Sequence, residues 1–228
     1  MQVYLTRPIM KRNNSNLIAL NVAFAACLIV ANVVTAKVIY TGISISGTPI
    51  LIPGAALTYA MTFLCTDIIG EIWGKEEADK AVWRGFFAQL VSMLLILLTK
   101  FLPPYNEEMQ HSYNMLLGQT PMFVFGSMAA YLCSQKWDVW IFHKIRGYFF
   151  ADPKYRWIWN NISTMTSQII DTAIYISIAF GFGMGWFFQN GGFRLVLCMV
   201  VGQYLLKAGL AVIDTPFFYF LTRKKQIN

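Results

Sequence analysis

Apolar residues along the chain fall into long runs that short polar segments separate. About 20 apolar residues are needed to cross a hydrocarbon core roughly 30 Å thick, and six runs come close to or exceed that length. They predict an all-α, integral membrane bundle of six transmembrane helices, in a single transmembrane domain that covers residues 1–228. We expect the spans at approximately Leu17–Val38, Pro53–Trp73, Ala81–Leu102, Gln119–Trp140, Trp157–Trp186 and Arg194–Leu221.

The segment between the first two runs has a different pattern. From Ile43 the sequence alternates Ile with Ser, and Gly47 and Pro49 interrupt it before Pro53. Such alternation with Gly and Pro is typical of a short strand pair or a turn. We therefore expect either a small extramembrane hairpin or a re-entrant segment there.

Composition supports lipid as the solvent of most of the chain. Hydrophobic residues make up 57% of the chain and charged residues 13%, whereas soluble domains have about 25% charged residues. A soluble fold of this size could not bury so much apolar surface. The same balance excludes a disordered chain, since disorder needs high charge and few aromatics.

The distribution of Lys and Arg predicts the orientation in the membrane. If the N-terminus is cytoplasmic, thirteen basic residues flank the cytoplasmic ends of the spans and three the opposite ends. Because basic loops stay in the cytoplasm, we expect both termini on the cytoplasmic side. The membrane we expect is the cytoplasmic (inner) membrane of a prokaryote. The net charge of +7 then reflects topology and contact with anionic lipid, and it requires no nucleic acid partner.

Motifs of soluble catalysis are not found in the sequence. The four cysteines are isolated from one another, His111 and His143 are expected on opposite membrane sides, and no Walker A, GxSxG or HExxH pattern occurs. We therefore expect no enzymatic activity, no cofactor and no bound metal. An intramembrane enzyme with Asp171 and Asp214 as an acid pair is disfavoured, because their expected depths differ and no signature surrounds them.

Polar and charged residues inside the predicted spans are the candidate functional residues. A charge at the centre of a span costs about 2.5–3.5 kcal/mol on insertion scales, so such residues are retained mainly for function. Residues four apart, such as Asp67 and Glu71, project from one helix face. The candidate binding residues are Asn32, Asp67, Glu71, Gln168, Asp171, Lys207 and Asp214.

Depth estimates group some of these residues. At 1.5 Å per residue, Asp171 and Lys207 each lie about 20 Å from one end of their spans, near the bilayer middle, and we expect them to form an ion pair. Asp67 and Asp214 are expected in the cytoplasmic half. These residues predict an acidic cavity between the second, fifth and sixth spans that suits a small solute with N–H donors or a cation.

Structural explanations stay open for two of the acidic residues. Glu71 lies close to Trp73 and can extend its carboxylate to the membrane surface, and Asp214 precedes Pro216 and can cap a helix segment. Structural roles of this kind account less well for the fifth span, because Thr164, Gln168 and Asp171 continue one polar face there for several turns.

Several segments resemble the queuosine precursor transporter family, six-span membrane proteins related to vitamin uptake proteins. The two most specific patterns are TDIIGEIWG and STMTSQIIDT. The segments that carry the resemblance are Asn32–Lys37 (NVVTAK), Thr66–Gly74 (TDIIGEIWG), Gly85–Ala88 (GFFA), Gly118–Pro121 (GQTP), Ser163–Thr172 (STMTSQIIDT) and Gln203–Lys207 (QYLLK).

The resemblance implies import of 7-deazaguanine precursors of queuosine, such as 7-cyano- or 7-aminomethyl-7-deazaguanine, for tRNA modification. Under this hypothesis Asp171, oriented by Gln168, or Asp67 binds the guanine edge, and Lys207 faces the exocyclic carbonyl or holds Asp171 in the empty state. We expect a secondary carrier. The alternative is the substrate-binding subunit of an energy-coupling-factor transporter, for a vitamin or nucleobase-like solute, with ATPase and coupling subunits as partners.

Overall fold

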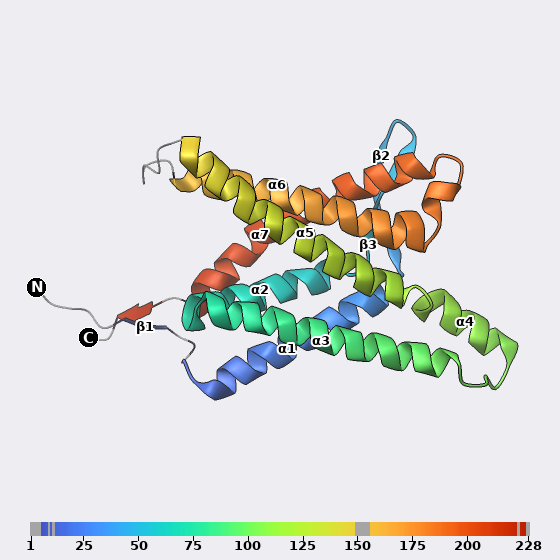
Figure 1. The fold of residues 1–228 in the computed structure, drawn as a ribbon, viewed down its shortest axis with the longest axis horizontal. Coiled ribbons are helices and arrows are strands. Elements are labelled where there is room, and N and C mark those ends of the chain that lie inside the picture. The colour runs from blue at the N-terminus through green and yellow to red at the C-terminus, as the bar shows by residue number, and fades with distance from the viewer. Residues whose placement is uncertain (1–5, 9, 11, 149–155, 223, 227–228) are drawn as a thin grey trace, which may run out of the picture. The chain divides into compact units, whose positions relative to one another are not determined.

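The computed structural model describes residues 6–8, 10, 12–148, 156–222 and 224–226, with the backbone alone for 6–8, 57, 60, 146–148, 156–161, 211–222 and 224–226. The described chain is mostly helical (Figure 1) and divides into two compact units. Unit 1 comprises Met1–Val38, Pro53–Gly118 and Leu205–Asn228, and unit 2 comprises Ile39–Ile52 and Gln119–Tyr204. The single domain over residues 1–228 stays a prediction.

Three packed helices form the centre of unit 1: α1 (Asn14–Val34), α2 (Ala56–Trp73) and α3 (Lys75–Lys100). The Asn13 side chain caps α1, because its Oδ1 accepts a hydrogen bond from the Asn16 amide at 2.8 Å. Gly74 separates α2 from α3 with a φ of 99°, a conformation that favours glycine. This single residue reverses the chain direction between the two helices.

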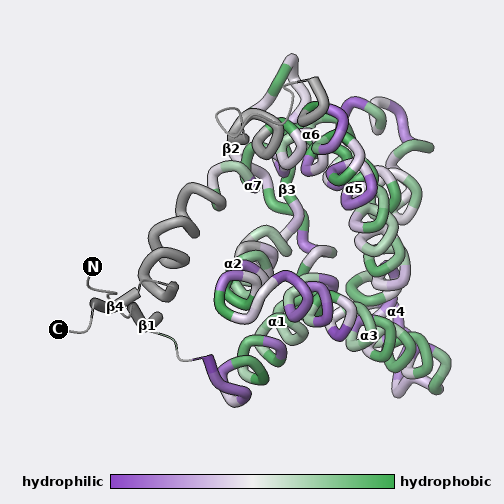
Figure 2. The backbone as a smooth tube through the Cα atoms, turned by 60° about the vertical axis from the view of Figure 1, so that its left-hand side comes forward, coloured by the Kyte–Doolittle hydropathy of each residue, from purple (hydrophilic) through white to green (hydrophobic). Residues whose placement is uncertain are grey.

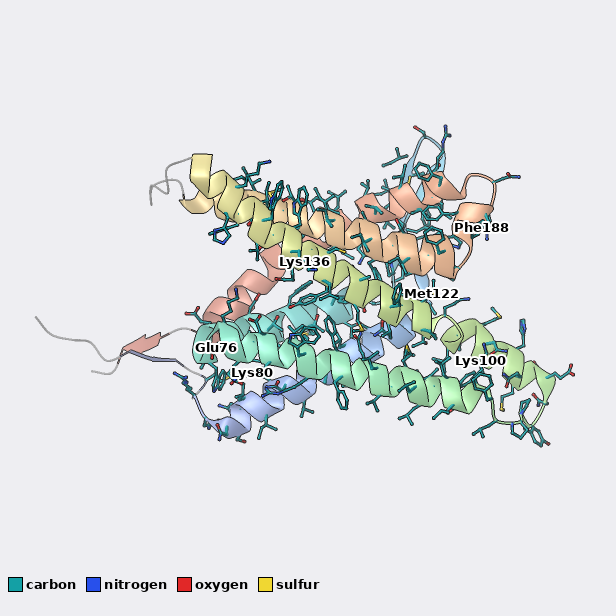
Figure 3. All side chains as sticks on the ribbon, in the orientation of Figure 1. Glu76, Lys80, Lys100, Met122, Lys136 and Phe188 are labelled. Atoms are coloured by element: carbon teal, nitrogen blue, oxygen red, sulfur yellow. The ribbon has the colours of Figure 1, made fainter. Side chains whose placement is uncertain are left out.

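The charged residues of α3 lie toward its ends. Figure 3 shows Glu76 and Lys80 near the beginning of α3 and Lys100 at its other end. Between them, apolar side chains such as Phe87 and Leu98 are 70% and 64% exposed. Figure 2 shows the same change, from hydrophilic to hydrophobic, along the helix. Exposed apolar side chains along a long helix are what a lipid environment favours.

A helix that the sequence analysis did not predict, α4 (Glu107–Leu117), follows α3 in unit 1. Asn106 caps it by accepting a hydrogen bond from the Met109 amide at 2.8 Å, and Glu107 and Glu108 stand in its first turn, where acidic residues stabilise a helix. The Tyr113 hydroxyl donates to the Ile96 carbonyl of α3 at 2.7 Å, which holds α4 against its neighbour.

Short strands from the two ends of the chain pair in unit 1. Strand β1 (Thr6–Pro8) runs antiparallel to β4 (Lys224–Gln226), with Arg7 opposite Lys225. The sequence pattern gave no indication of a strand at either end. The pairing brings together the segments that precede α1 and follow the last helix.

The predicted hairpin between the first two spans is confirmed as β2 (Val38–Ile45) and β3 (Thr48–Pro53), which form a two-stranded sheet. Ser46 and Gly47 connect the strands with φ values of 49° and 79°, and two positive φ values in a two-residue connection match the twist of paired strands. Gly202 of the last helix lies against β3, where an added Cβ would be 3.0 Å from the Leu51 carbonyl oxygen.

Unit 2 is built around α5 (Thr120–Tyr148) and α6 (Arg156–Ile176), which pack along their lengths. A π-helical segment, η2 (Ser177–Gly183), continues α6, and a short 3-10 helix, η3 (Trp186–Phe188), leads to α7 (Gly192–Thr222). Gly183 of η2 approaches α5 closely, since an added Cβ there would lie 2.9 Å from Cβ of Met122.

Five stretches in the described residues are long and apolar enough to cross a membrane: Asn14–Val34, Lys75–Lys100, Glu107–Ile145, Ile162–Gly183 and Gly192–Leu210. Helix α2 occupies the position of the second predicted span, but it is not among the five; it carries Asp67 and Glu71. The chain is therefore a mostly helical, multi-pass membrane protein. The number of six spans and the cytoplasmic termini stay predictions.

Candidate functional site

The interior of unit 1 contains one of the predicted binding residues. Asn32 of α1 is 2% exposed. Its Nδ2 donates to the Leu28 carbonyl at 3.1 Å, whereas its Oδ1 has no hydrogen-bond partner among the described residues. Buried amide oxygens are normally hydrogen-bonded, so this oxygen is a candidate acceptor for a ligand.

Asp67 and Glu71 lie on the opposite side of α2 from its packed face. The packed face presents Cys65, Ile68 and Ile69, which are buried, whereas both carboxylates are exposed. The four-residue spacing places the two acids one turn apart on the same side of the helix. Within unit 1 the two carboxylates therefore form an exposed acidic face on α2, whereas Asn32 is buried on α1.

The polar stripe of α6 changes character along the helix. Thr164 is exposed, Gln168 and Asp171 are half-buried, and Tyr175 is 3% exposed. Tyr175 packs on α5 at Gly126, where an added Cβ would lie 3.5 Å from Cδ2 of the tyrosine. The inner end of the stripe is thus a packing contact, and Gln168 and Asp171 are the members that combine partial access with polarity.

Beside this stripe, α5 and α6 exchange hydrogen bonds. Ser167 Oγ donates to Asp138 Oδ1 at 3.2 Å, and the Trp137 indole N–H donates to Thr166 Oγ1 at 3.1 Å. Asp138 is half-buried. It is not among the seven binding residues predicted from the sequence. The sequence could have identified Asp138 as a candidate, because it is an acidic residue within the fourth predicted span.

The remaining two candidates lie on α7. Lys207 is half-buried and belongs to unit 1, whereas Asp171 belongs to unit 2. The ion pair between Lys207 and Asp171 stays a prediction. The acidic cavity between the second, fifth and sixth spans stays one as well. The side chain of Asp214 lies outside the described residues. In the part of the chain that the structure describes, no three His, Cys, Asp or Glu side chains come together as a metal site requires.

Three further residues, which were not predicted as candidates, have buried polar atoms without a hydrogen-bond partner among the described residues. These atoms are Nε2 and Oε1 of Gln89, Oγ1 of Thr120 and Oε1 of Gln203. Gln89 is 1% exposed in α3, Thr120 is 2% exposed at the start of α5, and Gln203 is 3% exposed in α7. Gln89 is distinct because both of its polar atoms are unsatisfied.

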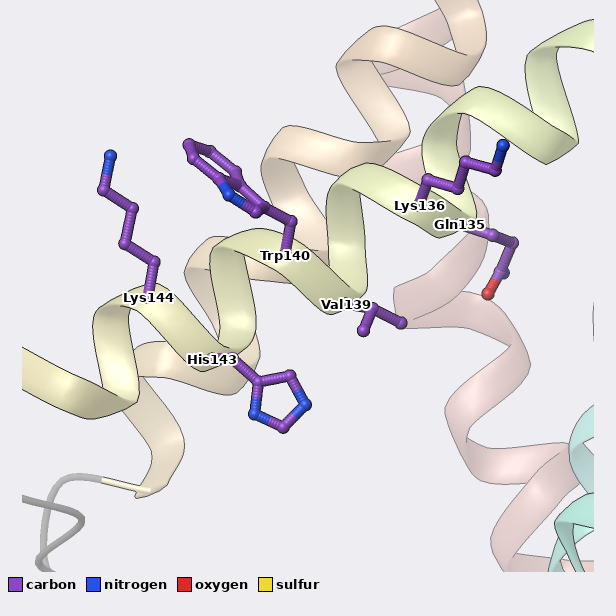
Figure 4. A pocket seen from close by; sticks show the side chains of 6 residues that line it. All are labelled: Gln135, Lys136, Val139, Trp140, His143 and Lys144. Carbon is purple, nitrogen blue, oxygen red and sulfur yellow. The ribbon is translucent and has the colours of Figure 1, made fainter.

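Helix α5 carries a surface hollow (Figure 4), and none of the seven predicted residues is among the residues that line it. Lys144 Nζ lies 4.5 Å from the centre of the Trp140 ring. Trp beside Lys is typical of the membrane–water interface, where lipid headgroups are contacted. The lining residues are Gln135, Lys136, Val139, Trp140, His143 and Lys144.

Comparison with known proteins places these residues in a family context. A family model described as "Putative vitamin uptake transporter" matches residues 53–221. A protein of Bacillus subtilis (strain 168) named "Probable queuosine precursor transporter" is 31% identical over 163 residues, which are 71% of this chain and 67% of that protein.

A protein of Haemophilus influenzae (strain ATCC 51907 / DSM 11121 / KW20 / Rd) with the same name is 29% identical over 128 residues. That match covers 54% of this chain and spans half, 50%, of the relative's length. No solved structure matches the chain. The family match includes α2, α3, α5, α6 and most of α7, and therefore six of the seven candidate residues. The chain belongs to the family of putative vitamin uptake transporters.

Proposed function

We propose that this chain transports queuosine precursors, 7-cyano- or 7-aminomethyl-7-deazaguanine, into the cell. The observation that carries the proposal is the 31% identity over 163 residues to a relative named as a queuosine precursor transporter. The chain's long apolar helices and multi-pass character suit a membrane carrier. Transport by such a chain requires polar side chains within the spans, and these are present on α1, α2, α6 and α7.

The chemistry of the candidate residues suits a deazaguanine. Its ring N–H and exocyclic amine are adjacent donors, and a carboxylate accepts paired hydrogen bonds from such donors. Asp67, one turn from Glu71, and Asp171, one turn from Gln168, are the candidate carboxylates for this contact. The aminomethyl form adds a positive charge, which a second carboxylate stabilises.

The test is uptake by cells that cannot synthesise the precursors and depend on the chain for queuosine in their tRNA. We expect queuosine to appear with the wild-type chain and external 7-cyano-7-deazaguanine. Asp67→Asn and Asp171→Asn keep the side-chain size and remove the charge, so at least one of them should lower uptake about tenfold or more. Wild-type uptake in both variants, at equal amounts in the membrane, contradicts the proposed role of the carboxylates.

We further propose that the chain acts as a secondary carrier without ATPase subunits. Purified protein in liposomes should then accumulate the precursor, and a proton gradient should alter the rate if a carboxylate also carries a proton. Transport that appears only after ATPase and coupling subunits are added would instead support the energy-coupling-factor alternative.

A further inference from the structure

The buried amide of Gln89 has no structural explanation within its unit. The side chain is 1% exposed, and neither Oε1 nor Nε2 has a hydrogen-bond partner among the described residues. Gln89 follows Lys75 by fourteen residues and precedes Lys100 by eleven, so it lies about 21 Å and about 17 Å from the two ends of α3. An amide at this depth gains nothing from bulk water. Folding alone would favour an apolar residue here.

Asn32 lies at nearly the same level of the neighbouring helix. Helices α1 and α3 run in the same direction (Figure 1) and meet at Gly85, where an added Cβ would be 3.1 Å from Cδ2 of Leu28. Asn32 is one helical turn beyond Leu28, and Gln89 is one turn beyond Gly85. Both side chains are buried, and three of their four amide heteroatoms have no partner in the described chain.

An amide side chain recognises a particular chemical group. Its oxygen accepts one hydrogen bond while its nitrogen donates another. A planar heterocycle with adjacent N–H and C=O groups, a lactam edge, presents the complementary pair. The carboxylates of Asp67 and Glu71 accept hydrogen bonds but cannot donate to a carbonyl when they are ionised. An amide therefore supplies what the acidic candidates lack.

We propose that Gln89 is a solute-binding residue that pairs its amide with the lactam edge of the transported heterocycle, which leaves the exocyclic amine for a carboxylate, and that Asn32 Oδ1 accepts a further N–H. This inference rests on the proposed function, since a 7-deazaguanine carries such an edge. Because both side chains are buried where α1 and α3 pack, the solute reaches Gln89 only if the two helices separate at the level of Asn32. Solute binding and opening of this interface are therefore linked.

The test measures binding of 7-cyano-7-deazaguanine, and of an analogue with hydrogen in place of the ring carbonyl oxygen, to purified full-length protein. Wild type should bind the parent compound at least about tenfold more tightly than the analogue, because a site built around a hydrogen bond rejects a ligand that lacks it. Gln89→Met has a similar shape without polar atoms. It should weaken binding of the parent about tenfold or more and reduce the preference over the analogue to less than about threefold.

Thermal unfolding separates a binding role from a structural one. Gln89→Met removes an unsatisfied buried amide, so its melting temperature without ligand should equal or exceed that of wild type. The matched control is Gln135→Met, which changes an exposed glutamine on α5 and should leave affinity and preference at wild-type values. If Gln89→Met does not fold, Gln89→Asn keeps the amide and withdraws it by one methylene, and it should also lose affinity.

Each outcome decides between the two proposals. If wild type binds the precursor and the folded Gln89 variant retains both its affinity and its preference for the carbonyl compound, the role of Gln89 is wrong and the proposed function stands. If folded wild type binds and transports no deazaguanine, the proposed function is wrong, and the role of Gln89 is wrong with it.

Discussion

The α1–α2–α3 core of unit 1 and the α5–α6 pair of unit 2 both place polar side chains at contacts between helices, but these side chains differ in burial and in hydrogen bonding. In the α5–α6 pair, Ser167 and Trp137 form hydrogen bonds across the interface. In the core of unit 1, Asn32 and Gln89 keep amide atoms without partners among the described residues. Interhelical hydrogen bonds stabilise packed spans, whereas unsatisfied buried amides destabilise them. The more exposed contacts of Ser167 and Trp137 are thus satisfied within the fold, whereas the buried amides of Asn32 and Gln89, like Thr120 Oγ1 at the start of α5, lack partners among the described residues.

The largest expected effect comes from placing a larger side chain in the contact between α1 and α3. Gly85→Leu would push a side chain into Phe24 and Leu28, and overpacking of this kind costs about 1–3 kcal/mol or more. We expect a large drop in melting temperature and in the amount of monodisperse protein. Gly209→Leu is the control, since no atom of the described residues lies within 4 Å of an added Cβ at that position. Equal melting temperatures for the two variants would contradict close packing at Gly85.

Replacing Asn32 tests the unsatisfied side of the comparison. Asn32→Leu removes the orphaned Oδ1 and leaves a side chain of similar size, so stability should change little while affinity for the precursor falls about tenfold, which is about 1.4 kcal/mol. Binding titration together with thermal unfolding measures both quantities. An Asn32→Leu protein that is strongly destabilised, yet binds normally once folded, would make Asn32 a structural residue.

Ser167→Ala tests the satisfied side. It removes the donor to Asp138, and interhelical hydrogen bonds in membrane proteins average about 0.6 kcal/mol. We expect a small loss of stability with uptake retained. Ser127→Ala serves as the control, because Ser127 bonds only within its own helix, to the Val124 carbonyl at 2.9 Å in the described contacts. A loss of uptake without a loss of stability would move Ser167 and Asp138 into the binding site.

The sequence predicted the parts of the fold that depend on local pattern. Long apolar runs predicted the long helices, and Ile-Ser alternation predicted the β2–β3 hairpin, whereas the number of spans stays a prediction. Helix α4 was not predicted, although Asn106 and the two glutamates after it form a recognisable start signal, because its eleven residues are too short for a membrane span. The π-helical geometry of η2 was not predicted, since the apolar pattern of Ser177–Gly183 does not distinguish a π-helix from an α-helix.

The candidate site divides in the same way. Asp67 and Glu71 were found because charge inside a span is conspicuous, and four-residue spacing defines a helix face. Gln89 carries no charge and stands alone in an apolar run, so only the packing of α3 reveals that its amide is buried and unsatisfied. The joint site of Asp67, Asp171 and Lys207 stays a prediction, because it depends on contacts between distant helices that no local pattern specifies.

The smallest expected effect concerns Trp137, whose indole N–H donates to Thr166 at 3.1 Å. Trp137→Phe keeps an aromatic ring beside Trp140, whose ring centre lies 5.1 Å away, and removes the hydrogen bond together with part of the ring. Because Trp137 is 37% exposed, other donors can replace the lost bond, so the melting temperature should fall less than in Ser167→Ala. A fall larger than that of Ser167→Ala would show that the hydrogen bonds of the α5–α6 pair are strongest at its exposed rim, and burial would then be a poor guide to which polar contacts hold these helices together.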